Sequence, residues 1–395
     1  MGRRPGLDAS SGPDLGLVRA FLAAGHTEWA AEVAAFAADV LRGRPHVDDD
    51  DGARSEAREL LELMGDAGVY APIADRDLRA CCLAREAVAA ASPLADAVFA
   101  LQGLGITPLL IAGTEALQER WAAPALEGRA MSAFAMTEPE AGSDVASMAT
   151  RATRDGDTWV IDGTKHLISN AGIADYYVVF ASTDPDAGSR GISAFVVPAD
   201  APGLGFGGAQ IMSAPHPLGE IVLEECRVPA SHLLGEAGEG FKIGMATLDQ
   251  LRPTVGAAAC GMASRALEEA VGHATTRRQF GKPLSSFQLI QEKLGRMAID
   301  LAAARLLVYR AAYERDTGAE RITTEAAMAK AFATEAAQRI VDDAVQIVGG
   351  RGVLTSHPVD HLYRSVRALR IYEGTTEIQH LIIAGALVAG AEERS

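Results

Sequence analysis

Cysteine, aromatic residues and basic charge are all scarce in this chain of 395 residues. Its four cysteines form neither a Cys-x-x-Cys pair nor a metal-ligand spacing, so we expect reduced thiols and neither a disulfide framework nor a zinc site. Lysine and arginine number 36 against 52 aspartates and glutamates, which gives a formal net charge of −16. Because phosphate backbones repel so negative a chain, nucleic acid is not an expected partner.

Long hydrophobic runs and an export signal are also missing. The twin arginine Arg3 and Arg4 is not followed by an apolar segment. The apolar run at 381–387 is short and is broken by Gly385, and no run approaches the roughly 18 to 20 residues that a membrane span needs. We therefore expect a cytoplasmic protein without a membrane span.

The residues that are present predict a large core and two or three domains, since 48% of the chain is hydrophobic. From about residue 13 to 129 the apolar spacing is helical. One such helix carries apolar residues at i, i+3, i+4 and i+7, namely Ala57, Leu60, Leu61 and Met64. We expect Gly65 to end this helix and the acidic run at 48–51 to form a solvated loop.

The middle and the end of the chain have different textures. Between about 131 and 229, short runs of β-branched and aromatic residues predict strands near 158–163, 176–181, 191–198 and 221–224. From about 240 the helical pattern returns, and an apolar seam suited to a bundle core is formed by Ile290, Leu294, Met297, Leu301 and Val308. The predicted fold is α+β. Its parts are an N-terminal helical domain (1–130), a sandwich-like or barrel-like β domain (131–235) and a C-terminal four-helix bundle (236–395).

One glycine pattern is misleading. Residues 203–208, GLGFGG, match the Gly-x-Gly-x-x-Gly spacing of dinucleotide-binding loops. They follow Pro202, lie among predicted strands and open no helix, whereas a phosphate cradle requires a helix N-terminus. We predict a turn or a strand connection here.

Three polar, glycine-rich segments are candidates for chemistry. MTEPEAGSD at 136–144 offers hydroxyls and backbone amides for a flat polar ligand and its phosphates, or forms an ordinary turn. TRRQFGKP at 276–283 places three cations around an aromatic ring, which suits a pyrophosphate or solvent. In IYEGTT at 371–376, Glu373 directly follows an apolar and an aromatic residue. Desolvation there raises the pKa of a carboxylate, as a general base near neutral pH requires; helix capping is the alternative.

These three segments, together with QIVGGRG at 346–352 and the order helical, β, helical, resemble the acyl-CoA dehydrogenase family. The resemblance extends from about residue 15 to 390. It implies FAD as cofactor, an acyl thioester as substrate, an electron-transferring flavoprotein as acceptor and a homotetramer or homodimer.

The resemblance also implies roles for individual residues. The isoalloxazine ring is expected to contact Met136, Thr137, Leu167, Ile168 and Ser169, with Ser143 near the pyrophosphate and the thioester arm. Residues reaching the ADP half from a neighbouring subunit are expected to be Arg277, Gln279, Phe280, Gln288, Gln346 and Gly350. Thr375 and Glu377, with Gly374, close over the cofactor. The substrate is expected to meet Ser143, Asp249, Arg252, Tyr372 and Gly374.

Glu373 matches the catalytic base of the family. By the resemblance, it removes the α-proton while the β-hydrogen passes as hydride to flavin N5, which yields a trans-2-enoyl thioester and reduced FAD. The backbone N–H of Glu373 and a ribityl hydroxyl are expected to stabilise the charge on the thioester oxygen.

The chain departs from the family in three places. Leu167 replaces a common tryptophan beside the flavin, which leaves the electron acceptor open. Ser365 replaces an aspartate, so a local salt bridge is expected to be rearranged. The segment at 71–78 is shorter than the usual glycine-rich entrance loop and predicts an open acyl entrance.

Several readings stay open for the substrate and the activity. The absence of arginine from 93–110 argues against a glutaryl-type decarboxylating enzyme. A carrier-protein-bound acyl group is the main alternative substrate. The remote alternatives are a DNA-associated or a non-catalytic flavoprotein of the same fold.

Overall fold

The computed structural model describes residues 12–392, and these divide into two compact units. The sheet unit contains Val47–Arg76 and Ala97–Leu251. The bundle unit contains Asp77–Asp96, the described residues up to His46 and those from Arg252 onward. Each unit is described separately below. The fold class predicted from the sequence, α+β with a central sheet and a helical C-terminal part, is confirmed.

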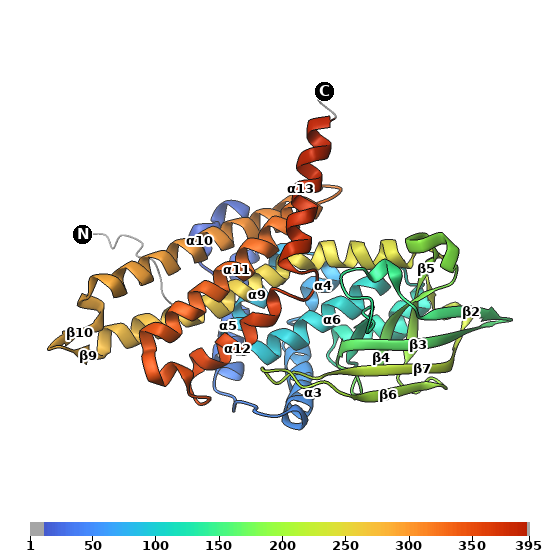
Figure 1. The fold of residues 1–395 in the computed structure, drawn as a ribbon, viewed down its shortest axis with the longest axis horizontal. Coiled ribbons are helices and arrows are strands. Elements are labelled where there is room, and N and C mark those ends of the chain that lie inside the picture. Colours follow the sequence, from blue (N-terminus) through green and yellow to red (C-terminus); the bar gives the residue numbers. More distant parts are fainter. Residues whose placement is uncertain (1–11, 393–395) are drawn as a thin grey trace. The chain divides into compact units, whose positions relative to one another are not determined.

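The sheet unit is built on a mixed eight-stranded sheet with the order β6-β7-β3-β2-β4-β5-β8, in which β1 pairs with β4 in parallel (Figure 1). Its strands are β1 Ser132–Ala135, β2 Arg151–Asp155, β3 Thr158–Ser169, β4 Tyr176–Ser182, β5 Ile192–Pro198, β6 Leu204–Ala209, β7 Leu218–Pro229 and β8 Leu233–Leu234. Every residue of β4 and β5 is buried, which explains their continuous hydrophobic sequences. Residues 204–208 of the misleading glycine pattern lie in β6, so this segment is a strand, and neither a phosphate loop nor the turn or strand connection predicted from the sequence.

Helices also belong to this unit. They are α3 Asp50–Asp66, α4 Ala71–Asp75, α7 Glu115–Leu117, α8 Ala123–Leu126 and most of α6 Pro93–Ala112. Helix α6 corrects the expectation that no apolar run reaches membrane-spanning length. It is long and apolar enough by length and composition, with a mean hydropathy of 1.7, but 72% of that window is buried. Core helices of globular proteins pass the same test, so this is weak evidence for a span.

Helix α3 corrects two details at its ends. The acidic run starts the helix instead of forming a loop: Asp49 caps it by accepting the N–H of Gly52, and Asp50 pairs with Arg54 over 2.6 Å. Gly65 lies inside the last turn and does not end the helix. A Cβ there would come within 2.4 Å of the carbonyl oxygen of Glu127, so the glycine permits a close backbone approach.

The bundle unit is helical, and α10 packs on both α11 and α5 (Figure 1). Its helices are α1 Leu15–Val18, α2 His26–Phe36, α5 Leu78–Ala91, the greater part of α9 Gly240–Thr276, α10 Gln288–Asp316, α11 Thr323–Val348, α12 Pro358–Leu369 and α13 Thr376–Glu392. The predicted seam of α10 is buried only from Met297 onward. Ile290 and Leu294 are half-buried, which leaves the N-terminal part of this helix open.

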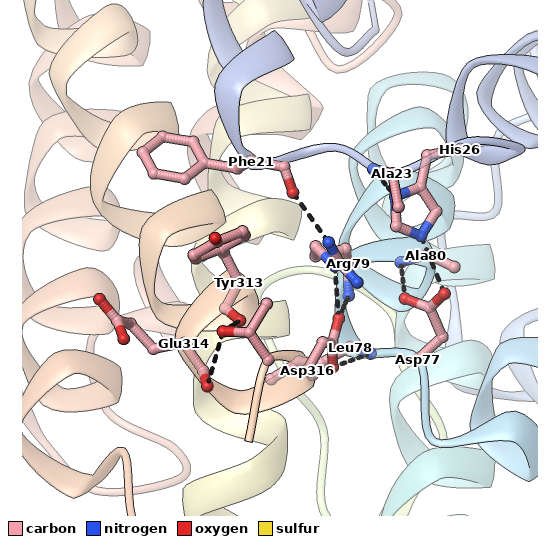
Figure 2. A network of polar contacts seen from close by, with 11 residues as sticks. Phe21, Ala23, His26, Asp77, Leu78, Arg79, Ala80, Tyr313, Glu314 and Asp316 are labelled. Carbon is pink, nitrogen blue, oxygen red and sulfur yellow. Dashed lines mark hydrogen bonds and ion pairs between the residues drawn. The ribbon is translucent and has the colours of Figure 1, made fainter. Parts of the chain in front are cut away.

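A polar network fixes the start of α5 (Figure 2). Asp77 caps the helix by accepting the N–H of Ala80 at 2.9 Å, and its other oxygen lies 2.8 Å from His26 Nε2. Asp316, at the end of α10, accepts the backbone N–H of Leu78 and of Arg79 at 3.0 Å. Two carboxylates, one from the N-cap residue and one from α10, thus satisfy the otherwise unpaired amides of this helix N-terminus.

Candidate active site

Glu373 lies in a tight turn between α12 and α13, within the bundle unit. The turn is closed by the N–H of Thr376, which donates to the carbonyl of Arg370. Glu373 has φ +54° and Gly374 has φ +94°, so two successive residues adopt left-handed conformations. Glycine adopts this conformation without cost, whereas glutamate does so at a cost of about 1 kcal/mol or more. Surrounding contacts must therefore hold the turn in place.

The carboxyl group of Glu373 is partly withdrawn from water. The side chain is half-buried, and its Oε2 is buried with no hydrogen-bond partner among residues 12–392. Burial raises the pKa of Glu373, while the positive charges of Arg85, Arg252 and Lys330 oppose the increase. The desolvated carboxylate expected from the sequence is confirmed, and its environment suits a general base.

Side chains from three helices hold the backbone of this turn. Arg252 Nε on α9 donates to the carbonyl of Glu373 at 3.0 Å. Lys330 Nζ on α11 donates to the carbonyl of Gly374 at 2.6 Å. Gln379 Nε2 on α13 donates to the same two carbonyls, at 3.3 and 3.0 Å. The structure thus places Arg252, which the resemblance assigned to substrate binding, on the backbone of the base itself.

A buried ion pair lies close enough to influence Glu373 electrostatically. Arg85 donates to both carboxylate oxygens of Asp96, at 2.8 and 3.0 Å, and to the hydroxyl of Thr254 at 2.8 Å. Sequence reasoning missed Arg85, Asp96, Lys330 and Gln379. The one available signal was a charged or amide side chain on the apolar face of a helix, as with Lys330 in the alanine-rich run of α11.

In the sheet unit, the structure brings the predicted flavin-ring residues onto β1 and β3. Met136 and Thr137 follow β1, and the N–H of His166 in β3 donates to the carbonyl of Thr137 at 2.9 Å. At the end of β3, Ile168 is buried and Ser169 half-buried. Leu167 has φ +55° and its side chain is 53% exposed. Leu167, where the resemblance leads us to expect a tryptophan, is thus the exposed residue at this end of the strand.

Polar contacts fix this end of β3 from two sides. His216 Nε2 lies 2.7 Å from Ser169 Oγ, and burial lowers the pKa of His216 to about 4, so the ring is neutral at physiological pH. Gln210 Oε1 accepts the N–H of Leu167 at 2.9 Å. Ser143 is exposed in the loop after Met136, and Asp249 is half-buried on α9.

A second pair, Lys165 and Glu138, lies beneath the same strands. Lys165 Nζ is 2.7 Å from Glu138 Oε1 and also donates to the carbonyl of Met136 at 3.2 Å. Both side chains are buried, and burial lowers the pKa of Lys165 to about 8. The pair supports the backbone on which the predicted flavin residues lie. Sequence reasoning did not identify it.

The residues predicted to reach the ADP half lie on the surface of the bundle unit. The segment at 276–283, expected as a loop, contains a hairpin of β9 Arg278–Gln279 and β10 Lys282–Pro283. Phe280 and Gly281 form its turn with φ +49° and +80°, as a two-residue hairpin requires, and Phe280 is 91% exposed. The remaining members of this group are also exposed, namely Arg277, Gln279, Gln288, Gln346 and Gly350. Glu377, which was expected to close over the cofactor, is exposed as well.

Comparison with known proteins identifies the family. Sequence models of the acyl-CoA dehydrogenase N-terminal, middle and C-terminal domains match residues 24–129, 133–226 and 238–388. The chain is 38% identical over 372 residues to the probable acyl-CoA dehydrogenase fadE25 of Mycobacterium leprae, covering 92% of this chain and 95% of the relative. The chain belongs to the acyl-CoA dehydrogenase family.

Solved structures agree with this assignment. The butyryl-CoA dehydrogenase of Megasphaera elsdenii superposes with a TM-score of 0.86 at 36% identity, covering 93% of this chain and 99% of that one. A glutaryl-CoA dehydrogenase of Mycobacterium smegmatis in complex with FADH2 gives a TM-score of 0.85 at 29% identity, covering 94% and 96%. This chain is accordingly a flavin-dependent oxidoreductase, and FAD is the cofactor of its family.

The residues present fit such a cofactor. The side chains of Arg277, Gln288 and Gln346 make no hydrogen bond within the described part of the chain, although all three carry donors. Exposed, unpaired guanidinium and amide groups suit a pyrophosphate and an adenine. These residues are therefore candidates to hold the ADP half, whereas Met136, Thr137 and residues 167–169 are candidates to contact the flavin ring.

Proposed function

We propose that this protein oxidises a saturated, short, straight-chain acyl-CoA to its trans-2-enoyl thioester, with Glu373 as the base. The observation that carries the proposal is the buried, unpaired Oε2 of Glu373 on a strained turn. A buried carboxylate oxygen without a hydrogen-bond partner is free to accept a proton from a C–H group of the substrate. The choice of a short acyl chain is supported by the likeness to the butyryl-CoA dehydrogenase of Megasphaera elsdenii.

The chain's own groups account for the proton transfer. Oε2 of Glu373 accepts the α-proton, and its raised pKa makes it a stronger base than an exposed carboxylate. The backbone N–H of Glu373 donates to none of the described residues, so it can bind the thioester oxygen on which negative charge develops. Bound FAD supplies the hydride acceptor. Tyr372 and Gly374, the chain neighbours of the base, are proposed to contact the substrate, and Ser143 and Asp249 of the sheet unit are proposed substrate contacts as well.

We also propose that the assembly is a homotetramer or homodimer in which FAD touches two subunits. The ADP-binding candidates are exposed, and large apolar side chains are exposed beside them on α10, Leu289 at 79% and Ile299 at 70%. Helix α13 exposes Leu381, Leu387 and Val388 as well. A second copy of the chain would cover these surfaces. Residues 1–130, 131–235 and 236–395 are proposed as the functional domains.

We propose that an electron-transferring flavoprotein accepts the electrons from this protein. We also propose that the protein is located in the cytoplasm. Because Leu167 is exposed where the resemblance leads us to expect a tryptophan, acceptor docking is proposed to depend on this residue.

An anaerobic titration tests the reaction. The purified holoenzyme is mixed with butyryl-CoA, and the flavin absorption is followed. Loss of the oxidised flavin band with formation of crotonyl-CoA supports the proposal. A protein that binds FAD and stays yellow with every acyl-CoA, in contrast, contradicts it.

A further inference from the structure

Lys330 is a buried cation whose role the family assignment does not explain. Its side chain is fully buried in α11, and no carboxylate within residues 12–392 forms an ion pair with it. Among residues 12–392, its ammonium group donates to one acceptor, the carbonyl of Gly374 at 2.6 Å. Burying an ammonium group costs several kcal/mol unless it is paired and hydrogen-bonded. A lysine held in this way by one backbone carbonyl therefore indicates a specific function.

The contact lies next to the most strained part of the active site. Glu373 and Gly374 both have positive φ, and their carbonyls are the acceptors for Arg252, Lys330 and Gln379. Each donor comes from a different helix. Arg252 and Gln379 both bind the carbonyl of Glu373, whereas Lys330 binds only that of Gly374. Lys330 is thus the cationic donor to the second carbonyl of the turn.

The charges around this turn are mixed. Glu373 faces the cations Arg85, Arg252 and Lys330 and the carboxylate Asp96. Lys330 faces Glu373, Arg252, Glu335 and Glu377. Burial lowers the pKa of Lys330 to about 8, and Glu373 is the strongest group that acts to restore its charge. Glu373 and Lys330 therefore stabilise each other's charged forms.

We propose that Lys330 is a positioning residue for the base: its ammonium group fixes the Gly374 carbonyl, and its charge favours the ionised carboxylate of Glu373. The proposal rests on the proposed function of Glu373. It predicts two separable effects. Loss of the hydrogen bond displaces the carboxylate and slows proton transfer at every pH. Loss of the charge raises the pKa of Glu373 and moves the acid limb of the rate profile to higher pH.

The first experiment uses the FAD-loaded enzyme and anaerobic stopped-flow reduction by butyryl-CoA across the pH range. Lys330→Met removes both the donor and the charge, and Lys330→Gln keeps a donor without charge. Lys242→Met, at an exposed lysine of α9, is the matched control. We expect reduction by Lys330→Met to be about 100-fold slower at neutral pH, as displacement of a reacting group by about 1 Å produces. Both Lys330 variants should shift the acid limb upward, and only Lys330→Gln should recover rate at high pH.

The second experiment does not depend on turnover or on folding of a lysine variant. The chain has five lysines, so selective ¹³C labelling at Cε allows Lys330 to be titrated by NMR. In Glu373→Gln the pKa of Lys330 should fall below its wild-type value, because the favourable carboxylate charge is gone. The control Glu320→Gln, which changes an exposed glutamate, should leave it unchanged.

The outcomes separate this inference from the proposed function. If Glu373→Gln loses flavin reduction but does not move the Lys330 titration, or if the acid limb stays in place in Lys330→Met, the inference is wrong. A uniform rate loss at all pH values, together with a lower melting temperature, indicates a purely structural lysine and also overturns it. If the flavin of Glu373→Gln is reduced at the wild-type rate, Glu373 is not the base and the proposed function is wrong, whatever the Lys330 titration shows.

Discussion

At the scale of single residues, the chemistry depends on the environment of Glu373. Glu373→Gln keeps the shape of the side chain but cannot accept a proton. We expect the holoenzyme to retain its fold and FAD while reduction by butyryl-CoA falls by about 10²- to 10⁴-fold. In the wild type the rate should rise with pH through a pKa above the ordinary value of a glutamate, since the base must be ionised and burial raises its pKa. Rapid mixing under anaerobic conditions measures both effects, and an unchanged rate would place the base elsewhere.

A second residue-scale prediction concerns the Lys165–Glu138 pair. Lys165→Met leaves the Glu138 carboxylate buried without its cation, which costs about 3 to 5 kcal/mol of unfolding free energy. Replacing Lys165 by Met and Glu138 by Gln together should cost less, because no uncompensated charge then remains. Urea denaturation of the two variants at neutral pH measures the difference. Equal losses in both would show that the pair is not electrostatically coupled.

The same residues show what the sequence could predict at this scale. The motif at 371–376 was enough to predict Glu373 as the base and its carboxyl group as buried, because the preceding apolar residues and the following glycine are local features of the sequence. Lys330 and Arg85 come from helices that are distant in the sequence, and only the tertiary fold brings them near Glu373. Gln379 lies six residues after Glu373, but its bond to the turn depends on how the turn folds. Arg252 illustrates the limit of analogy. The resemblance assigned it to substrate binding, but the backbone contact it makes depends on a turn whose geometry no spacing reveals.

At the scale of elements, periodicity predicted which helices and strands exist better than it predicted where they begin and end. The buried residues of α3 matched, whereas the acidic run proved to start that helix and Gly65 to lie within it. N-caps and close approaches are decided by single hydrogen bonds and contacts, which apolar spacing does not encode. In α10 the seam was predicted to be uniformly buried, yet its first residues, Ile290 and Leu294, are only half-buried in the single chain. A helix that packs on another copy has the same apolar spacing as one that packs on its own chain.

The capped N-terminus of α5 gives the prediction at this scale (Figure 2). Burial opposes ionisation of Asp77, but the hydrogen bonds from His26 and Ala80 outweigh it and lower the pKa of Asp77 to about 2. Asp77→Ala should cost about 1 to 2 kcal/mol at neutral pH, and Asp77→Asn less, because an asparagine still caps the helix. The deficit should shrink as pH falls from about 4 towards 2, where the wild-type carboxylate becomes protonated. Denaturation curves at several pH values measure it, and a deficit independent of pH would contradict the assigned cause.

At the scale of the whole molecule, cofactor and assembly are expected to be linked. Arg277→Ala removes an exposed, unpaired cation, so it should weaken FAD retention while leaving the helical content and melting temperature of the chain nearly unchanged. FAD released on gel filtration and the mass from light scattering are measured together. Arg278→Ala, on the same hairpin, is the control. A 41.3 kDa monomer with FAD fully bound would refute the shared site.

The width of the acyl entrance is the remaining property of the whole molecule. A shortened connection at 71–78 predicted an open mouth for branched, cyclic or carrier-bound acyl groups, but this segment folds as α4, with Pro72 and Ile73 buried. We propose that this packed helix narrows the acyl entrance, where each methylene of a bound chain that is buried contributes about 0.8 kcal/mol. We therefore expect kcat/KM to show a sharp optimum for one short straight-chain acyl-CoA, with branched, cyclic and carrier-bound thioesters far slower. The measurement is kcat/KM for each acyl group on coenzyme A and on a carrier protein. Equal values for straight and branched chains would restore the open entrance, because a site without a wall cannot discriminate by shape.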